Sequence, residues 1–261
     1  MSTYGGAMEF RELYLAGEDV EEIAVSRDHA VSEHGIFGYS DILKQTEYVC
    51  GLLKREQPDT LFMVGGGCDV SAPAVSYLNS RLDGRLTVLW LDAHGDLNTP
   101  ESSPSGLFHG MPLRLLLGEG DDKLLKLLDA PLAPSQIMLA GTRDLDEPEQ
   151  EYIAESRIDM LTPDALRDPQ TIVNAFREKG NSHIYVHIDL DVLEPSAFAY
   201  VPLPVAGGLD PDVLVLLLQS LSDAFEIAGL SVVEYMDAVG RRCAVLEEIA
   251  RIGTGLAQRS L

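Results

Sequence analysis

The chain has 261 residues, with 19 Lys plus Arg against 42 Asp plus Glu, a formal net charge of −23 and 46% apolar positions. A chain of this length can bury enough surface to support its own core. The strongly negative charge argues against nucleic-acid backbones and anionic membrane surfaces as partners, because both are themselves negative. Small molecules and metal cations fit this charge better.

Cysteine usage and the N-terminal sequence predict a cytoplasmic protein. Cys50, Cys68 and Cys243 are too few and too scattered for a disulfide framework, which indicates reduced thiols. Residues 1–10 lack the basic and apolar regions of a signal peptide, and no uncharged apolar run reaches the ~18 residues of a membrane span. We therefore expect a soluble protein that is not exported.

Short apolar runs alternate with segments of helical period after an N-terminal stretch of about 35 residues without a clear pattern. Continuous apolar runs are typical of parallel strands covered on both faces, so an α/β fold is expected, with three α/β/α layers and a central parallel sheet. No repeat or linker is visible, which favours a single domain, 1–261. The predicted elements are helix Asp41–Arg55, strands Thr60–Val64 and Leu86–Leu91, helix Asp122–Leu128, strand Gln136–Ala140, helix Gln170–Lys179, strand Ile184–Ile188, a helix opening at Asp210-Pro211, strand Gly229–Val233 and helix Arg241–Arg251.

Polar clusters follow three of the predicted strands. They are Gly65–Asp69, Asp92–Asn98 and Asp189–Asp191. The carboxyl ends of parallel strands meet at one edge of a sheet, where ligands bind in open α/β folds. We therefore expect the three clusters to share one site.

The spacing of acids in these clusters predicts a metal centre. Asp92, His94 and Asp96 alternate, so their side chains share a face of an extended segment, and Asp189 and Asp191 repeat the pattern. Four close carboxylates without Lys or Arg among them require cations. Carboxylate and imidazole ligands suit Mn²⁺, Fe²⁺ or Zn²⁺, and this set is large enough for two ions. A single DxD is usually a plain polar loop end, but two such strand ends favour a two-metal hydrolase.

Three motifs resemble those of the ureohydrolases, the arginase and agmatinase superfamily. Residues 92–98 resemble DAHxDxN, residues 187–195 resemble SxDxDxxDP, and residues 105–112 resemble SGxxHGxP. The resemblance spans about Leu61 to Asp237. It implies an arginase-like fold, two Mn²⁺ ions, a small guanidine substrate and a homo-oligomer, either a trimer or a hexamer.

The resemblance also implies a role for each matching residue. Asp92 and Asp189 would bridge the two ions, Asp96 would bind one ion, and His94 and Asp191 would bind the other. Catalysis would use three residues. Glu234 would orient the guanidinium group, Asp96 would pass the proton of the attacking bridging hydroxide to the departing amine, and His109 would exchange protons with solvent.

The first metal motif departs from the family pattern. Where the family has GGDH, this chain has Gly66-Gly67-Cys68 after Gly65, so that Cys68 stands in the place of the first metal-binding histidine. A thiolate is a softer ligand than imidazole, so Zn²⁺ or Fe²⁺ becomes possible. A subgroup with this cysteine includes an enzyme acting on Nω-hydroxy-arginine. His187 also stands where the family has a small polar residue, and it is left without a role.

Substrate choice is indicated by a fourth segment. Residues 141–149 resemble the arginase pattern GxRDxDxxE, whose last two acids, here Asp146 and Glu149, contact the α-amino group of the substrate. Asn98 and Ser105 match positions that contact the α-carboxylate. These matches favour arginine or Nω-hydroxy-arginine, giving ornithine plus urea or hydroxyurea. Leu107 and Phe108 replace a polar position, which leaves the preference open.

Several alternatives remain on the sequence alone. The chain could act on agmatine, guanidinobutyrate or formiminoglutamate, or be a metal-poor paralogue without catalysis. From a different class, Cys68 could be the nucleophile of a cysteine hydrolase with His94 or His109 as base. Asp189 could instead be the nucleophile of a dehalogenase-like phosphatase, although that motif normally opens the chain.

Overall fold

A six-stranded parallel sheet forms the centre of the computed structural model, which describes residues 2–26, 30–180, 182–238 and 240–257. Every pair of neighbouring strands in this sheet is parallel, as the apolar runs predict. A separate antiparallel hairpin joins β1 (Ser32–Glu33) to β2 (Ile36–Phe37). In spatial order the strands of the large sheet are β3 (Leu61–Val64), β8 (Glu226–Val233), β7 (His183–Asp189), β4 (Leu86–Leu91), β5 (Ile137–Ala140) and β6 (Asp159–Leu161).

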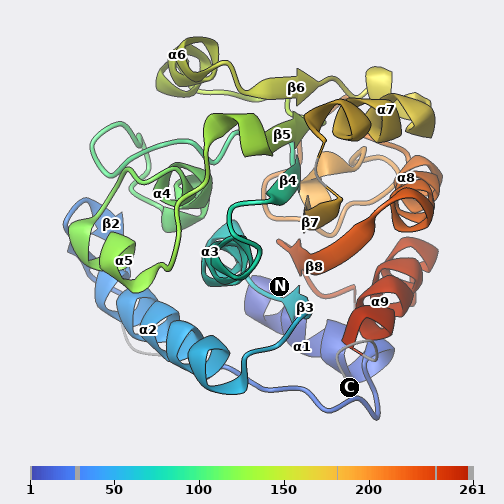
Figure 1. Cartoon of the computed structure of the whole chain (residues 1–261). Helices are drawn as coiled ribbons and strands as arrows, with labels where there is room; N and C mark the ends of the chain where they lie inside the picture. Colours follow the sequence, from blue (N-terminus) through green and yellow to red (C-terminus); the bar gives the residue numbers. More distant parts are fainter. Residues whose placement is uncertain (1, 27–29, 181, 239, 258–261) are drawn as a thin grey trace.

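Helices cover both faces of this sheet, which confirms the three-layer α/β/α architecture (Figure 1). Each face carries its own apolar cluster, so the sheet is buried on both sides. One face is covered by α1 (Thr3–Tyr14), α7 (Pro169–Lys179), α8 (Pro211–Ala224) and α9 (Ala244–Ala257). The other is covered by α2 (Tyr39–Glu56), α3 (Ser71–Arg81), α4 (Pro112–Leu116), α5 (Asp122–Leu127) and α6 (Glu147–Ser156).

Local capping explains where two predicted helices begin and end. The side chains of Asp168 and Asp210 each accept a hydrogen bond from the backbone amide two residues later, and a proline follows each of them at the first helical position. Helix α7 ends at Gly180, which adopts a φ of 77° that favours glycine. The predicted positions of α7 and α8 are confirmed.

The last predicted helix begins later than expected. Instead of starting at Arg241, α9 starts at Ala244, so the prediction was wrong for its first three residues. The amide of Cys243 donates to the hydroxyl of Tyr14, and the guanidinium of Arg242 donates to the carbonyl of Leu13. Contacts to α1 therefore hold residues 241–243 outside α9, so that Cys243 lies just before this helix.

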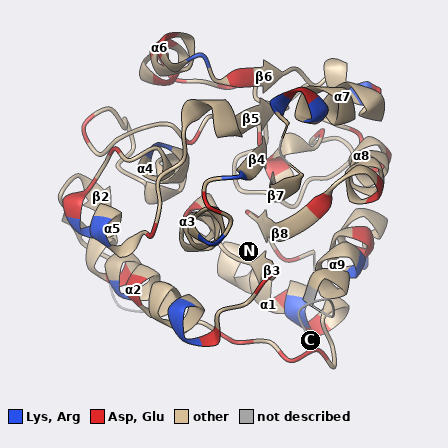
Figure 2. Ribbon diagram, viewed as in Figure 1, with Lys and Arg blue, Asp and Glu red and all other residues tan. Residues whose placement is uncertain are grey.

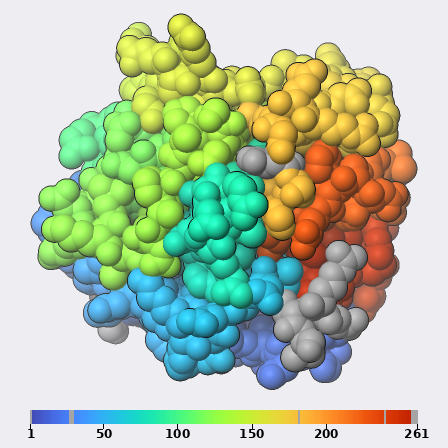
Figure 3. Space-filling model, viewed as in Figure 1, coloured from blue at the N-terminus to red at the C-terminus, as the bar shows by residue number. Residues whose placement is uncertain are grey.

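The distribution of acidic residues agrees with the negative net charge of the sequence. Asp and Glu residues are distributed along the helices and loops on both sides of the sheet (Figure 2). In the space-filling view, the segment around α3 is packed between α2 and the segment of residues 110–140 (Figure 3). Within the described ranges, no helix combines the length and apolar character needed to span a membrane.

Candidate active site

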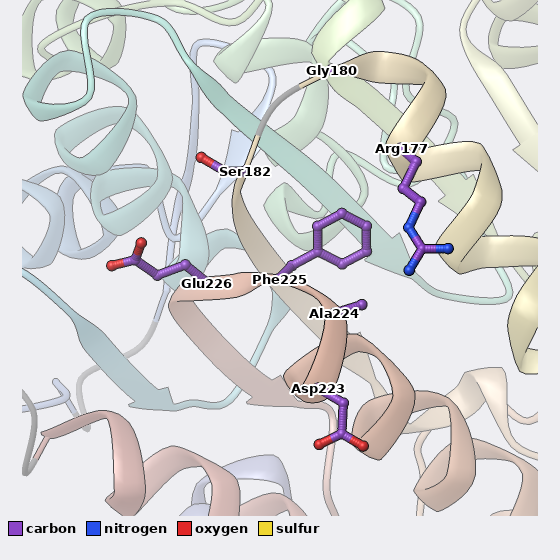
Figure 4. Close-up of a pocket in the computed structure, with 7 residues that line it drawn as sticks. All are labelled: Arg177, Gly180, Ser182, Asp223, Ala224, Phe225 and Glu226. Atoms are coloured by element: carbon purple, nitrogen blue, oxygen red, sulfur yellow. The ribbon is translucent and has the colours of Figure 1, made fainter.

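The predicted site residues gather at the carboxyl edge of the central strands. Cys68 follows β3, Asp92 follows β4, Asp189 ends β7 and Glu234 follows β8. These strands are neighbours in the sheet, so their ends meet in space as the sequence predicts. The surface hollow lined by Arg177, Ser182 and Glu226 lies at the opposite edge, at the amino ends of β7 and β8, and contains none of these residues (Figure 4).

One set of metal-binding atoms surrounds the Cys68 thiol. Ligand atoms of Cys68, Asp92, Asp96 and His187 all lie within 4.8 Å of one another, and all four residues are buried. The thiol donates to Asp189 Oδ2 at 3.0 Å and to Asp92 Oδ2 at 3.8 Å. Three carboxylates and a thiol thus point into a small buried volume, which is an arrangement that can hold one divalent cation.

A second set surrounds His94. Ligand atoms of Asp92, His94 and Asp191 lie within 4.8 Å of one another. His94 Nδ1 lies 2.9 Å from Asp191 Oδ2 and 3.5 Å from Asp92 Oδ1. Asp92 belongs to both sets, with one oxygen facing each, and this is the geometry that two neighbouring cations sharing a carboxylate require.

The pKa shifts in this cluster indicate an excess of negative charge. Burial, with the neighbouring charge of Asp191, raises the pKa of Asp92 to about 7. Burial likewise raises the pKa values of Asp96 and Asp189 well above their usual range. For His94, burial alone would lower the pKa, but hydrogen bonds with Asp191 and Asp92 raise it to about 11. Divalent cations would relieve the repulsion among these carboxylates.

The same environment argues against Cys68 as a nucleophile. Burial raises the pKa of its thiol well above the ordinary value, and the charges of Asp96, Asp189 and Asp92 raise it further. A nucleophilic cysteine needs the opposite, namely a thiolate stabilised by positive charge. The thiol is better suited to binding a metal that displaces its proton.

Backbone hydrogen bonds fix the orientation of the cluster. Asp189 Oδ1 accepts from the amide of Asp191, and Asp191 Oδ1 accepts from the amide of Ala93, which joins the ends of β7 and β4. The guanidinium of Arg143 donates to the carbonyls of Asp191 at 2.8 Å and Val205 at 2.7 Å. Arg143 therefore supports the loop behind the cluster through backbone contacts.

Glu234 and His109 form a hydrogen-bonded pair beside the cluster. Their Oε1 and Nδ1 atoms are 3.1 Å apart, with 6% of the Glu234 side chain and 27% of the His109 side chain exposed. The bond to Glu234 raises the pKa of His109. Glu234 and Asp96 both adopt positive φ angles, 56° and 54°, which are rare for residues other than glycine and recur at functional sites.

A further acid lies against this pair. Burial and the charge of Glu234 raise the pKa of Asp69 to about 6. A Cβ atom at Gly67 would lie 2.6 Å from Asp69 Oδ1 and 3.4 Å from Glu234 Oε1, so only glycine leaves room for both carboxylates. The glycine-rich turn after β3 therefore places a second carboxylate next to Glu234.

The residues predicted to contact the amino-acid end of a substrate are only partly together. Asn98 Nδ2 donates to Asp146 Oδ2 at 3.1 Å. Glu149 is buried, and its two oxygens accept from the amides of Leu97 and Asp146, so its carboxylate caps α6 and holds the neighbouring loop. Ser105 is exposed, and its hydroxyl contacts the amide of Leu107 and the hydroxyl of Ser103.

Two residues at the site were not found by sequence reasoning. Trp90 Nε1 lies 3.3 Å from both Asp92 Oδ2 and Asp96 Oδ2 and donates toward them. Trp90 is two residues before Asp92 on β4, so strand alternation could have placed it on the same face. In the sequence, Asp69 stands out only as the last residue of the glycine-rich segment, and its proximity to Glu234 depends on the 3₁₀ turn η1 (Cys68–Val70).

Comparisons with known proteins agree with this geometry. The model of the arginase family matches residues 10–248. An arginase of Staphylococcus aureus strain MSSA476 is 33% identical over 253 residues, which cover 93% of this chain and 83% of that relative. The structure of Entamoeba histolytica arginase in complex with L-ornithine gives a TM-score of 0.86 at 21% identity and covers 98% of this chain and 92% of that chain. The arginase from Bacillus caldovelox gives 0.79 at 26% identity, covering 96% and 88%. The chain belongs to the arginase family.

Proposed function

We propose that this hydrolase cleaves the guanidinium C–N bond of arginine or a close derivative such as Nω-hydroxy-arginine. The products would be ornithine with urea, or ornithine with hydroxyurea. The observation that carries the proposal is the placement of a buried carboxylate, Glu234, beside two sets of metal-binding atoms that share Asp92. The relatives of 30–33% identity that carry the name arginase support the same substrate class.

The donor atoms fit two divalent cations. Cys68, Asp92, Asp96 and Asp189 would hold one ion, and Asp92, His94, Asp189 and Asp191 would hold the other. We propose Mn²⁺ as the resident metal, with Zn²⁺ or Fe²⁺ as the alternatives that the softer thiol ligand allows. Bound together, two such ions would supply a hydroxide nucleophile near neutral pH.

The residues of the chain would orient the substrate and move its protons. The Glu234 carboxylate would accept hydrogen bonds from the guanidinium group, which is planar and presents several N–H donors. Asp96, which lies among the metal-binding atoms, would accept the proton released by the attacking water and pass it to the departing amine. His109 is partly exposed and bonded to Glu234, so it would exchange protons between the buried site and solvent.

The amino-acid end of the substrate would lie near Asn98 and Asp146. Asp146 is exposed and its carboxylate already accepts from Asn98, so it is placed to accept from an α-ammonium group as well. Glu149 would act by holding this loop, and Ser105 by contacting the α-carboxylate from the neighbouring loop. One ureohydrolase domain over residues 1–261, a trimer or hexamer, and a cytoplasmic location stay predictions.

The test combines metal analysis with substrate comparison. Purified protein, loaded in turn with Mn²⁺, Zn²⁺ and Fe²⁺, would be assayed for urea or hydroxyurea release from arginine, Nω-hydroxy-arginine, agmatine and guanidinobutyrate. We expect two bound ions per chain and activity on the two amino acids. Activity on agmatine with none on arginine would contradict the role given to Asp146.

Two variants separate the two-metal proposal from its rivals. Asp92→Asn should lose activity and bound metal, whereas Asp164→Asn, an exposed aspartate in the loop before α7, should lose neither. Unchanged activity without metal in Asp92→Asn would refute the two-metal proposal. If the wild-type protein is active without bound metal, and Cys68→Ala abolishes that activity, the cysteine nucleophile would be favoured instead.

A further inference from the structure

His187 lies beneath the metal-binding cluster with one ring nitrogen unused. The residue is on β7, two positions before Asp189, so strand alternation places both on the same face of the sheet. Its side chain is completely buried and stacks on Trp90 with ring centroids 3.5 Å apart and planes 10° apart. Among the described residues, Nε2 of His187 has no hydrogen-bond partner. A buried imidazole nitrogen without a partner is costly and requires an explanation.

The other ring nitrogen is held by two hydroxyl groups. Nδ1 of His187 lies 2.9 Å from Ser71 Oγ and 3.2 Å from Ser231 Oγ, and the Ser71 hydroxyl itself donates to Ser231 Oγ. A hydrogen on Nδ1, donated to Ser71, continues this chain of donors and leaves the lone pair on Nε2. Histidines that bind metals commonly donate their second ring N–H to such a partner, which fixes the ring.

The free nitrogen has metal-binding neighbours. A ring nitrogen of His187 lies within 4.8 Å of ligand atoms of Cys68, Asp92 and Asp96. Since Nδ1 is occupied by the serines, Nε2 is the nitrogen available to this group.

Resting on the two-metal function above, we propose that His187 binds the metal ion next to Cys68 through Nε2. The inference accounts for two departures from the family motifs at once, because the chain has lost an imidazole at position 68 and gained one at position 187. The imidazole would reach the ion from the sheet below, while Cys68 reaches it from the turn after β3.

The proposed donor set changes which metal this site prefers. With a thiolate and an imidazole beside its carboxylates, this set is softer than the set around His94, which has an imidazole but no thiolate, and softer ligands favour Zn²⁺ or Fe²⁺ over Mn²⁺. The two positions would therefore differ in affinity, with the Cys68 side holding Zn²⁺ or Co²⁺ more tightly than Mn²⁺. If His187 only fills space in the core, this preference comes from the Cys68 thiolate alone and does not change in His187→Ser.

The test measures metal binding rather than turnover. Stoichiometry and dissociation constants for Zn²⁺ and Co²⁺ would be measured by chelator competition on the wild type, on His187→Ser and on His183→Ala. His183 is the matched control, since it lies on the same strand but at its other end, paired with Glu226. Outer-shell partners of metal ligands typically change affinity by about 10–100-fold, so loss of a direct ligand should weaken one of the two sites by about 100-fold or more.

Two further measurements keep the result interpretable if His187→Ser folds poorly. Adding Cys68→His to His187→Ser should restore the second ion by returning an imidazole from the turn. In the Co²⁺-loaded wild type, paramagnetically shifted imidazole N–H signals should come from two histidines, His94 and His187.

The possible outcomes separate the two proposals. Two ions of unchanged affinity in His187→Ser, or shifted signals from His94 alone, would overturn the role of His187 and leave the proposed function standing. A wild-type protein that binds no metal would overturn both. Loss of one ion in His187→Ser, rescue by the second substitution and no change in His183→Ala would support the proposal.

Discussion

Helix α1 controls the position of the loop that carries Glu234, and Gly6 is the point of closest approach. A Cβ atom on Gly6 would lie 1.8 Å from the carbonyl oxygen of Tyr235 and 2.5 Å from its carbon. Contacts of this kind are not found below about 3.0 Å, so Gly6→Ala requires the helix and the loop to separate by roughly 1.2 Å. Both partners are backbone, and no side chain can rotate away to relieve the clash.

The separation also breaks a hydrogen-bonded anchor. Glu9, one turn after Gly6, accepts from the Tyr235 hydroxyl at 2.6 Å and from the amides of Ala238 and Gly240 at 2.7 Å each. A 1.2 Å movement would stretch these bonds beyond hydrogen-bonding distance. Overpacking costs about 1–3 kcal/mol, and loss of a hydrogen bond to a charged group costs about 1.5–3 kcal/mol, while alanine returns up to about 1 kcal/mol of helix propensity. We expect Gly6→Ala to lower the free energy of unfolding by about 2–5 kcal/mol.

The neighbouring glycine provides a matched control. A Cβ atom on Gly5 would lie 3.4 Å from Asp237 Oδ1, which is an ordinary contact, so Gly5→Ala should leave stability unchanged or raise it by up to about 1 kcal/mol. Urea unfolding followed by circular dichroism gives both values, and kcat/KM for guanidine hydrolysis reports the shift of Glu234. Equal stability and equal kcat/KM for the two variants would refute the role assigned to α1.

Three further predictions concern charge and metal. Burial raises the pKa of Glu9, but hydrogen bonds from Tyr235, Gly240 and Ala238 outweigh this effect and lower the pKa below 4.5. The contribution of the Glu9 carboxylate to the free energy of unfolding is therefore fully present above pH 4.5, and it is lost as the pH falls through the lowered pKa. In urea unfolding, Glu9→Gln should cost about 1–3 kcal/mol at pH 7 and much less in acid, and a pH-independent loss would contradict this. Glu234→Gln should lower the pKa of His109, because the bond to Glu234 is what raises it; NMR titration of the ring would show a downward shift, and no shift would contradict the pair. Each bound metal ion, at about 100 times its dissociation constant, should stabilise the chain by about 2.7 kcal/mol, and a chelator should abolish this gain in a thermal melt. A melting temperature that neither metal nor chelator changes would contradict the metal centre.

Most strands of the central sheet were predictable because each is a short apolar run, and β4, β5, β7 and β8 are buried along most of their length. Within this sheet only β6 escaped prediction, since this edge strand has three residues and begins with Asp159, which forms an ion pair with Lys179 at the surface. Its strand character comes from pairing with β5 and not from its own composition. The short strands β1 and β2 of the separate hairpin also escaped prediction.

The missed helices lack the one-sided apolar pattern that reveals a helix. In α3, residues 71–79 are all buried and are rich in Ala and Ser, so no polar face marks the period. Helix α6 was hidden for a different reason, because Asp146 and Glu149 were interpreted through the substrate motif. The Glu149 carboxylate in fact accepts the amide of Asp146 at the start of that helix, which is a capping arrangement.

The grouping of the carboxylates and His94 could be predicted from the sequence better than the side chains around them. The structure does bring Asp92, His94 and Asp191 together, but not through extended strand geometry. Residues 190–192 form a 3₁₀ turn, and the segment after β4 bends, with Asp96 at a φ of 54°. The electrostatic interaction between Asp69 and Glu234 joins residues 165 positions apart, so no local pattern could indicate it. His187 is an intermediate case. Its position in a strand could be predicted from the sequence, but the lack of a hydrogen-bond partner for its Nε2 atom could not.

The part of the sequence that was hardest to interpret therefore has a direct connection to the chemistry. Helix α1 shows little amphipathic pattern, yet Gly6 and Glu9 together contact Tyr235, Ala238 and Gly240. Those three residues follow Glu234, whose positive φ is stable only if the backbone on both sides is fixed. One side is fixed by the hydrogen bond from the Glu234 amide to the Gly66 carbonyl, and the other by α1. Substitutions in this helix should thus act on guanidinium recognition without touching the substrate.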